Sequence, residues 1–269
     1  MTRPARPIGR YLFQAFGIAY GCWGAILALQ AVGVAYGTPV TMILLVIGGN
    51  GPLIAGFLAL RRRDPSFTLR RLVVTSFDVR ARPLQVVLSL AIVAVYFGTA
   101  ALAGGIASPA PLTTVLIAVL MIPLMAFGGG LEEVGWRHYL QPAMQERLPF
   151  VPATAVVSLI WIAWHLPLFL IVGTSQNGSN FLAFAATTWG LGFALGALHA
   201  VSGSAALCVL AHSAINSMFS AWPVSHDLGP NLVVAAALLV LALLVVGVGG
   251  QRRPRISARS KRTGSSNWA

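Results

Sequence analysis

Charged residues are scarce in this chain, and cysteines are scarcer still. Asp, Glu, Lys and Arg make up 9% of the 269 residues, whereas soluble domains carry about 25%. Hydrophobic residues reach 57%, so the composition excludes an ordinary soluble domain. The two cysteines, Cys22 and Cys208, lie inside apolar runs, which predicts buried free thiols and excludes a disulfide framework. Since six residues in all are acidic, an acid within an apolar run needs a specific reason.

Apolar runs of about 20 residues recur along the chain, and a helix of that length spans the roughly 30 Å hydrocarbon core of a bilayer. The sequence therefore predicts an all-α fold, a polytopic membrane helix bundle with about eight transmembrane helices. We place these helices at residues 13–35, 40–60, 84–106, 112–131, 153–172, 181–200, 204–221 and 231–250.

All 18 Lys and Arg residues fall on one side of such a bundle. They occupy residues 3–10, 61–82, 137–147 and 252–262. The loops that would face the other side contain neither Lys nor Arg: AYGTPV, ASPAPL, GTSQNGSN and PVSHDLGP. Because basic loops stay in the cytoplasm, we expect a multi-pass protein of the cell membrane with both termini inside.

The same placement explains the net charge of +12 without a nucleic-acid partner. We interpret residues 1–12 as a basic cytoplasmic N-terminus, residues 13–250 as the membrane helix bundle, and residues 251–269 as a basic, disordered cytoplasmic tail. A basic tail is attracted to anionic lipid, so the lipid bilayer is the partner that the charge predicts. The segment RRRDPSFTLRR, residues 61–71, is typical of a short loop or an interfacial piece.

Two of the six acids are adjacent, in the segment GGGLEEVGWRHYL, residues 128–140. Residues four apart share a helix face, so Glu133 and Arg137 can form an ion pair on the helix surface. Glu132 points about 100° away from Glu133 and lacks that partner. A carboxylate in an apolar cleft beside another negative charge should have a raised pKa, which suits a general base or acid. The alternative is a solvated charge cluster at an interfacial helix end.

Three further polar side chains lie within predicted spans: His165 in WIAWHLPLF, and His212 and Asn216 in LAHSAINSMF. An ionised side chain at bilayer depth costs at least about 2.5–3.5 kcal/mol, so such groups usually face a cavity or a partner. His212 and Asn216 are four residues apart and present a pair of donors on one helix face. Hydrogen bonding between helices is the alternative explanation for each of them.

Taken together, these side chains supply the parts of an acyl-transfer site. Glu132 would activate water, His165 would position the water or move its proton, and His212 with Asn216 would stabilise the oxyanion. No Ser or Cys lies in a nucleophile motif, so direct attack by water is the economical mechanism and no cofactor is expected. No H-E-x-x-H zinc motif is present; if a metal such as zinc is bound, Glu132, His165 and His212 are the predicted ligands.

The motifs EEVGWRHYLQP, WIAWH and AHSAIN resemble, in this order, those of the type II CAAX prenyl endopeptidase and bacteriocin-processing family of intramembrane proteases. The resemblance covers about residues 115–220, within a protease-like core at residues 112–221, and its motif residues are Glu132, Glu133 and Arg137, Trp161 and His165, and His212 and Asn216. It implies a glutamate base aided by His165, an oxyanion site at His212 and Asn216, and a site open to the cytoplasm. The implied substrate is a membrane-associated peptide or protein.

A straight fourth span would keep these groups apart. Counting the rise per residue, Glu132 would lie near the cytoplasmic edge, with His165 and His212 deeper in the bilayer. Either this span tilts and continues as a helix past Arg137, or the fifth and seventh spans enter the membrane later. The places where such adjustment costs little are Pro123, residues 128–130 and Pro167.

Two other classes of protein fit parts of the pattern. Intramembrane ionisable residues also mark substrate paths in transporters, but no inverted repeat is visible here. A non-catalytic immunity or scaffold protein of the same fold would not require the intact set of motifs. The sequence thus favours an intramembrane endopeptidase, and it does not name the substrate.

Overall fold

The computed structural model describes residues 7–77, 83–106, 108 and 110–249, and every regular element in these ranges is helical. The predicted basic tail, residues 251–269, and the first six residues lie outside the described part. The helices in chain order are α1 (Ile8–Ala31), α2 (Pro39–Gly49), α3 (Gly51–Arg63), α4 (Leu69–Ser76), α5 (Pro83–Leu102), α6 (Leu112–Met125), η1 (Ala126–Gly130), η2 (Val134–Leu140), α7 (Gln141–Gln145), α8 (Phe150–Trp164), η3 (Leu166–Phe169), α9 (Phe181–Ser202), α10 (Ala205–Met218) and α11 (Leu228–Gly249).

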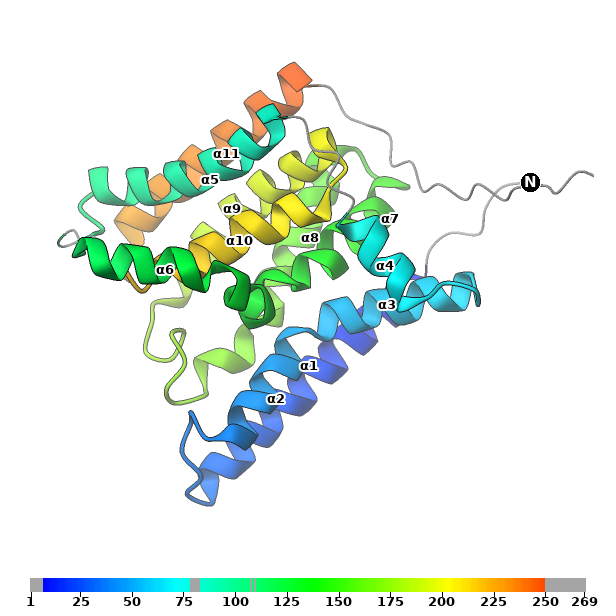
Figure 1. The fold of residues 1–269 in the computed structure, drawn as a ribbon, viewed down its shortest axis with the longest axis horizontal. Helices are drawn as coiled ribbons and strands as arrows, with labels where there is room; N and C mark the ends of the chain where they lie inside the picture. The colour runs from blue at the N-terminus through cyan, green and yellow to red at the C-terminus, as the bar shows by residue number, and fades with distance from the viewer. Residues whose placement is uncertain (1–6, 78–82, 107, 109, 250–269) are drawn as a thin grey trace, which may run out of the picture.

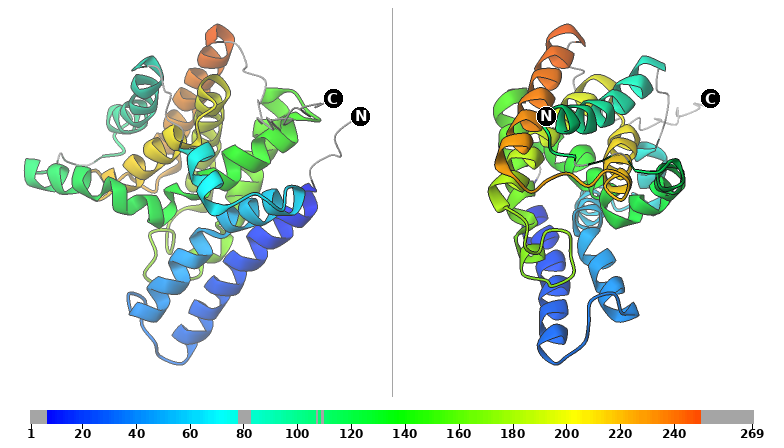
Figure 2. Two further views of the ribbon diagram at one scale, coloured as in Figure 1. Left: turned by 45° about the vertical axis from the view of Figure 1, so that its right-hand side comes forward. Right: turned by 90° about the vertical axis from the view of Figure 1, so that its left-hand side faces the viewer.

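Helices α9 and α10 occupy the middle of the bundle. On one side they are covered by α5 and α11, and α8 packs against α9 on another (Figure 1). Helices α1, α2 and α3 pack together into an arm that extends away from α11 (Figure 2). The polar motifs lie where this arm meets α8 and α10, because α3 packs against η2 and α10 packs against η1.

Six helices of the described part are long and apolar enough to cross a membrane, and α2 with α3 would add a seventh that is bent by 48°. This pattern indicates a multi-pass membrane helix bundle. The predicted span at residues 204–221 corresponds to α10, which is apolar but has 14 residues, short of the roughly 20 that a bilayer requires. The count of eight and the side on which the termini lie stay predictions.

The fourth predicted span is not a straight helix. Helix α6 ends at Met125, and the π-helical turn η1 follows it. Gly128 and Gly129 then leave helical geometry, and Gly129 has a φ of +142°, which glycine tolerates because it lacks a Cβ. The chain resumes as η2 and α7 and stays helical to Gln145. The expectation that this segment continues as a helix past Arg137 is therefore confirmed. Residues 112–130 remain a candidate membrane span, and this span is kinked at Gly128 and Gly129.

The fifth predicted span is also interrupted. Helix α8 ends at Trp164, His165 follows as its C-cap, and Pro167 lies in the short 3₁₀ helix η3. Proline lacks a backbone N–H and clashes with the preceding turn, which explains why an α-helix does not continue through residues 153–172. The break places the imidazole of His165 at a helix end.

Helix α9, the partner of α8 and α11, has well-defined ends. The side chain of Asn180 accepts hydrogen bonds from the backbone N–H groups of Leu182 and Ala183 at 2.9 and 3.3 Å, a standard N-cap. Gly203 ends the helix with a φ of +70°, a left-handed C-cap. The helix that follows, α10, carries His212 and Asn216.

Candidate active site

The expected ion pair between Glu133 and Arg137 is present, but it is buried. Arg137 Nε donates to Glu133 Oε2 at 2.7 Å, and both side chains have an exposed fraction of 0%. The predicted pair along one helix face is confirmed, and it is buried because α3 covers η2: a methyl group at Gly135 would overlap the backbone of Pro52. Removing one partner of a buried pair leaves the other charge uncompensated, so the two residues hold each other in place.

Arg137 also makes contacts that the sequence did not reveal. Its Nη1 donates to Gln141 Oε1 at 3.4 Å, and Gln141 Nε2 donates to Thr154 Oγ1 of α8 at 2.8 Å. Its guanidinium lies 5.7 Å from the ring centroid of Trp161, within cation–π range. The spacing of four between Arg137 and Gln141 is a signal that could have found Gln141, whereas nothing in the sequence marks Thr154.

Glu132 is held in a different way from Glu133. Its side chain is 2% exposed, and Oε1 accepts a hydrogen bond from the indole Nε1 of Trp161 at 3.2 Å. Oε2 has no hydrogen-bond partner within the described residues. The neighbouring carboxylates are thus unequal: Glu133 is fixed by a guanidinium, and Glu132 keeps one oxygen for another group.

His212 connects the two carboxylates from α10. Its Nδ1 lies 3.1 Å from Glu133 Oε1 and 3.5 Å from Glu132 Oε1. A carboxylate can only accept, so Nδ1 carries the hydrogen and donates to Glu133. The other ring nitrogen, Nε2, takes no part in these two contacts and can bind another group.

Asn216 and His212 do lie together, on the face of α10 that meets Gly129. A methyl group built on Gly129 would lie 2.8 Å from Asn216 Nδ2 and 3.9 Å from His212 Nε2. The two predicted donors therefore flank a backbone position without a side chain. Sequence reasoning noted the triple glycine but did not connect it to this pair.

His165 is linked to the cluster through Trp161. His165 Nδ1 lies 2.8 Å from the carbonyl oxygen of Trp161, and the ring packs against Trp164 and Phe184, at 4.9 and 5.0 Å between ring centroids. Since the carbonyl accepts, Nδ1 carries the hydrogen and Nε2 is the basic nitrogen of the neutral ring. Trp161 thus contacts Glu132 with its side chain and His165 with its backbone.

Residues 109–218 match the sequence model of the type II CAAX prenyl endopeptidase Rce1-like family. The match includes every motif residue described above, so the resemblance seen in the sequence is confirmed. The chain is also 31% identical over 87 residues to CAAX prenyl protease 2 of Methanococcus maripaludis. That alignment covers 32% of this chain and 30% of the relative, so the chain aligns with about a third of the relative's length.

The residues that could hold a metal ion differ from the ligand set that the sequence predicted. Ligand atoms of Glu132, Glu133 and His212 all lie within 4.8 Å of one another, and among the described residues this is the group that could hold an ion. Carboxylate and imidazole ligands fit a divalent cation such as zinc. His165, predicted as a ligand, is not a member of this group.

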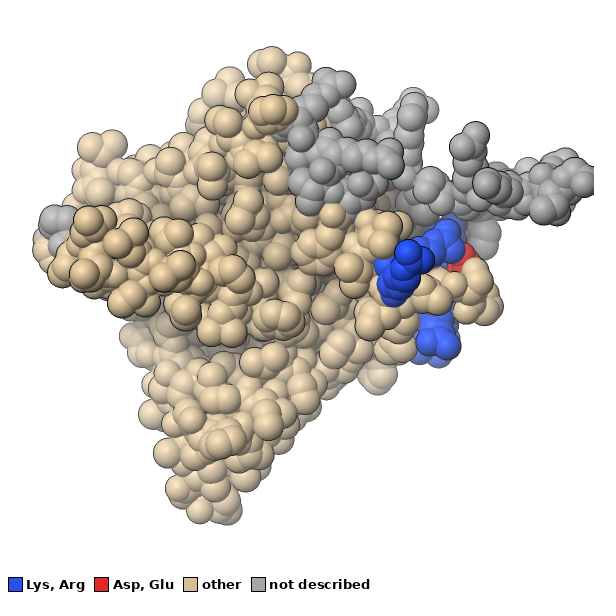
Figure 3. Space-filling model, in the orientation of Figure 1, with Lys and Arg blue, Asp and Glu red and all other residues tan. Residues whose placement is uncertain are grey.

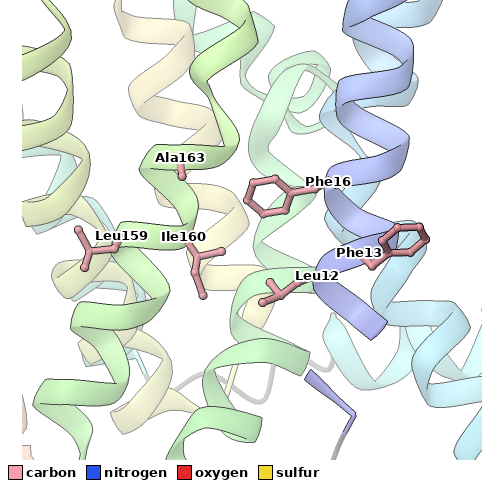
Figure 4. A pocket seen from close by; sticks show the side chains of 6 residues that line it. All are labelled: Leu12, Phe13, Phe16, Leu159, Ile160 and Ala163. Atoms are coloured by element: carbon pink, nitrogen blue, oxygen red, sulfur yellow. The ribbon is translucent and has the colours of Figure 1, made fainter. Parts of the chain in front are cut away.

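Two apolar hollows lie beside α1, apart from the carboxylates. One, of about 470 Å³, lies between α1 and α8 (Figure 4) and is lined by Leu12, Phe13, Phe16, Leu159, Ile160 and Ala163. The other, of about 590 Å³, is lined by Tyr20, Gly24, Leu27, Leu166, Pro167, Phe169, Leu170 and Phe181. Neither hollow is lined by Glu132, Glu133, Arg137, His165, His212 or Asn216.

Proposed function

We propose that this protein is an intramembrane endopeptidase of the CAAX-protease type, which hydrolyses a peptide bond of a membrane-associated protein or peptide. The observation that carries the proposal is the pair of unequal glutamates. Glu132 is buried with one oxygen free of hydrogen bonds within the described residues, and Glu133 beside it is fixed by Arg137. The match to the Rce1-like family over residues 109–218 supports a peptidase.

In the proposed mechanism Glu132 is the general base. Its carboxylate takes a proton from a water molecule, and the water oxygen attacks the carbonyl carbon of the scissile peptide bond. The tetrahedral intermediate collapses, the C–N bond breaks, and the protonated Glu132 returns its proton to the leaving amine. His165, whose Nε2 is the basic nitrogen, would position the water or relay the proton.

His212 and Asn216 would stabilise the oxyanion. Asn216 Nδ2 is a permanent donor, and it lies on the same side of Gly129 as His212 Nε2. Glu133 Oε1 lies 3.1 Å from His212 Nδ1 and orients the imidazole, whose Nε2 would donate when both ring nitrogens carry hydrogen. Glu133 and Arg137 would therefore act as positioning residues for His212.

The proposed mechanism routes no step through a metal. Were a divalent cation bound, Glu132, Glu133 and His212 would hold it, and it would polarise a carbonyl or acidify water. Treating the purified protein with a chelator tests this, because the proposed mechanism expects cleavage to continue.

We further propose that the protein lies in the cell membrane with both termini and the opening of its site on the cytoplasmic side. The one-sided distribution of Lys and Arg supports this orientation. A transporter is the alternative. We favour a hydrolase because Glu132 and Glu133 have different partners, and because His212 and Asn216 lie beside each other as possible oxyanion donors.

N-terminal proteomics of the membrane fraction tests the function. Cells would contain the wild-type protein, no protein, the Glu132→Ala variant, or the Asp227→Asn variant, which alters an acid outside the site. New protein N-termini should appear with the wild type and with Asp227→Asn, and should be absent in the other two. Identical N-termini in all four samples would refute a protease, and wild-type N-termini with Glu132→Ala would refute the assigned base.

A further inference from the structure

The segment from α3 to α4 concentrates positive charge at one end of the molecule. It carries five arginines within eleven residues: Arg61, Arg62, Arg63, Arg70 and Arg71. Figure 3 shows basic side chains gathered at this end of the molecule. Asp64 Oδ2 lies 2.6 Å from Arg71 Nη1, and hydrogen bonds from Ser66 and Arg71 hold the pKa of Asp64 below its ordinary value. Asp64 therefore offsets Arg71, and a net positive charge remains.

Helix α4 presents an apolar face to the outside. Thr68 caps its N-terminus by accepting a hydrogen bond from the N–H of Arg71 at 3.2 Å. Four large apolar residues are exposed at helical spacing, each by 37–62%: Leu69, Val73, Val74 and Phe77. Arg70 projects within the same angular range. A short helix with an exposed apolar face and adjacent arginines is the pattern of an interfacial membrane helix.

The opposite face of α4 packs against the wall of the candidate active site. Leu72 and Phe67 form one cluster with Val134 of η2 and Val209 of α10. Val134 follows Glu133 directly, and Val209 precedes His212 by three residues. Helix α4 therefore packs, through this apolar cluster, against segments that carry residues of the polar cluster.

We propose that α4 is an interfacial helix that binds anionic phospholipid headgroups at the membrane surface. Its four exposed apolar side chains would enter the acyl boundary, and the arginines would contact phosphates, with the stem of Arg70 lying along the apolar face. Charge complementarity favours lipid as the occupant, because each arginine close to an anionic membrane surface adds to the free energy of binding. The position of α4, directly after α3, keeps it at the end of a membrane-crossing element. The inference does not depend on the proposed protease activity.

A fluorescent probe on α4 tests the inference in the full-length protein. An environment-sensitive dye would be attached at Val74→Cys, with Thr75→Cys on the polar side of the helix as the matched control, in a chain carrying Cys22→Ala and Cys208→Ala. The protein would be placed in nanodiscs of phosphatidylcholine, alone or mixed with phosphatidylglycerol. We expect a lipid-borne quencher to reach the dye at position 74 much more than at position 75, and more strongly with phosphatidylglycerol.

Glutamine substitutions separate charge from apolar contact. Arg61→Gln, Arg63→Gln and Arg70→Gln spare Arg62, which donates to Gln14, and Arg71, which pairs with Asp64. Each should lower the preference for phosphatidylglycerol by about fivefold. If a water-soluble quencher reached the dye at position 74 in both lipid compositions, the proposal would be overturned. So would lipid quenching that ignores phosphatidylglycerol, which would show an apolar anchor without headgroup recognition, and so would protection from both quenchers, which would show a protein occupant.

Discussion

Glu132 and Glu133 are neighbours in sequence, yet their partners differ. The helix directs Glu133 toward Arg137, four residues on, whereas Glu132 meets the indole of Trp161 and His212. A buried carboxylate beside a guanidinium is stabilised as the anion. Glu132 has one oxygen without a hydrogen bond in the described part, which is consistent with its proposed role as the base.

Arg137→Ala should destabilise the protein as well as inactivate it. The substitution leaves Glu133 buried and unpaired, at a cost of about 3–5 kcal/mol in the free energy of unfolding. Denaturation of the purified variant in detergent measures this cost, with the exposed Arg147→Ala as control. Normal stability together with full activity in Arg137→Ala would contradict the role assigned to the ion pair.

Two adjacent glycines should respond differently to alanine. At Gly128 a methyl group would meet Met125 Sδ at an ordinary 3.5 Å, whereas at Gly129, where φ is +142°, it would press against Asn216 Nδ2 at 2.8 Å. We expect Gly129→Ala to slow cleavage by up to the roughly 10²–10³ that one oxyanion donor contributes, and Gly128→Ala to have little effect.

A double variant tests whether Gly129 acts through Asn216. If the methyl group blocks this donor, Asn216→Ala already contains that loss, and adding Gly129→Ala should slow cleavage little further. Losses that simply multiply, accompanied by a matching drop in thermal stability, would instead indicate backbone strain at Gly129 unrelated to the donors.

At the scale of elements, the breaks in α6 and α8 bring the site together. The chain leaves α6 at residues 126–130, and Glu132 and Glu133 follow this break directly before η2, within reach of α10. Helix α8 stops at Trp164, so His165 caps its end beside Trp161. Without these breaks, the groups would lie at different depths of the bilayer.

Pro167→Ala should shift His165. Restoring the backbone N–H removes the block to helix continuation, and an extended α8 would rotate the imidazole away from its present position. We expect slower cleavage with thermal stability close to that of the wild type. The kinetics of Pro167→Ala and of Pro149→Ala, which alters the N-cap of the same helix, provide the comparison. Equal, full activity in both would show that the end of α8 does not position His165.

The sequence was sufficient for the helical class and for the motif residues, because apolar runs and spacings of four are local signals. It also marked residues 128–130 and Pro167 as places where a helix could break, and the structure confirms breaks there, but it could not give their geometry. The φ of Gly129 depends on the close approach of α10, which is a tertiary contact. Likewise, residues 40–60 read as one span, but the chain bends at Asn50, whose side chain donates to the carbonyl of Val46. The next helix begins at Gly51, with Pro52 in its first turn. Gln141 and Thr154 required the folded structure for the same reason.

At the scale of the whole molecule, the charges and the loops lie at opposite ends. The basic side chains near α3 and α4 gather at the right of Figure 3, whereas the connections from α1 to α2 and from η3 to α9 lie at the bottom and lower left of Figure 1. This arrangement fits a bundle whose basic end lies on one side of the membrane and whose loops without Lys or Arg lie on the other. It leads to the expectation that the arginine-rich end faces the cytoplasm.

Labelling of single cysteines in intact cells checks the orientation. A thiol reagent that cannot cross the membrane should react with Ser175→Cys from outside, in the loop without Lys or Arg. It should react with Ser257→Cys, in the basic tail, only after the cells have been permeabilised. Both variants would carry Cys22→Ala and Cys208→Ala. Labelling of position 257 in intact cells would contradict the proposed orientation.

The central claim, that Glu132 is the base, is tested most directly by the rate at which Glu132→Gln cleaves a substrate identified by N-terminal proteomics. Glutamine keeps the shape of the side chain and can still accept the hydrogen bond from Trp161, but it cannot take a proton from water. In lipid nanodiscs we expect cleavage by Glu132→Gln to fall to background, far below Asn216→Ala, which should retain about 10⁻²–10⁻³ of the wild-type rate. Wild-type cleavage by Glu132→Gln would show that another group activates the water.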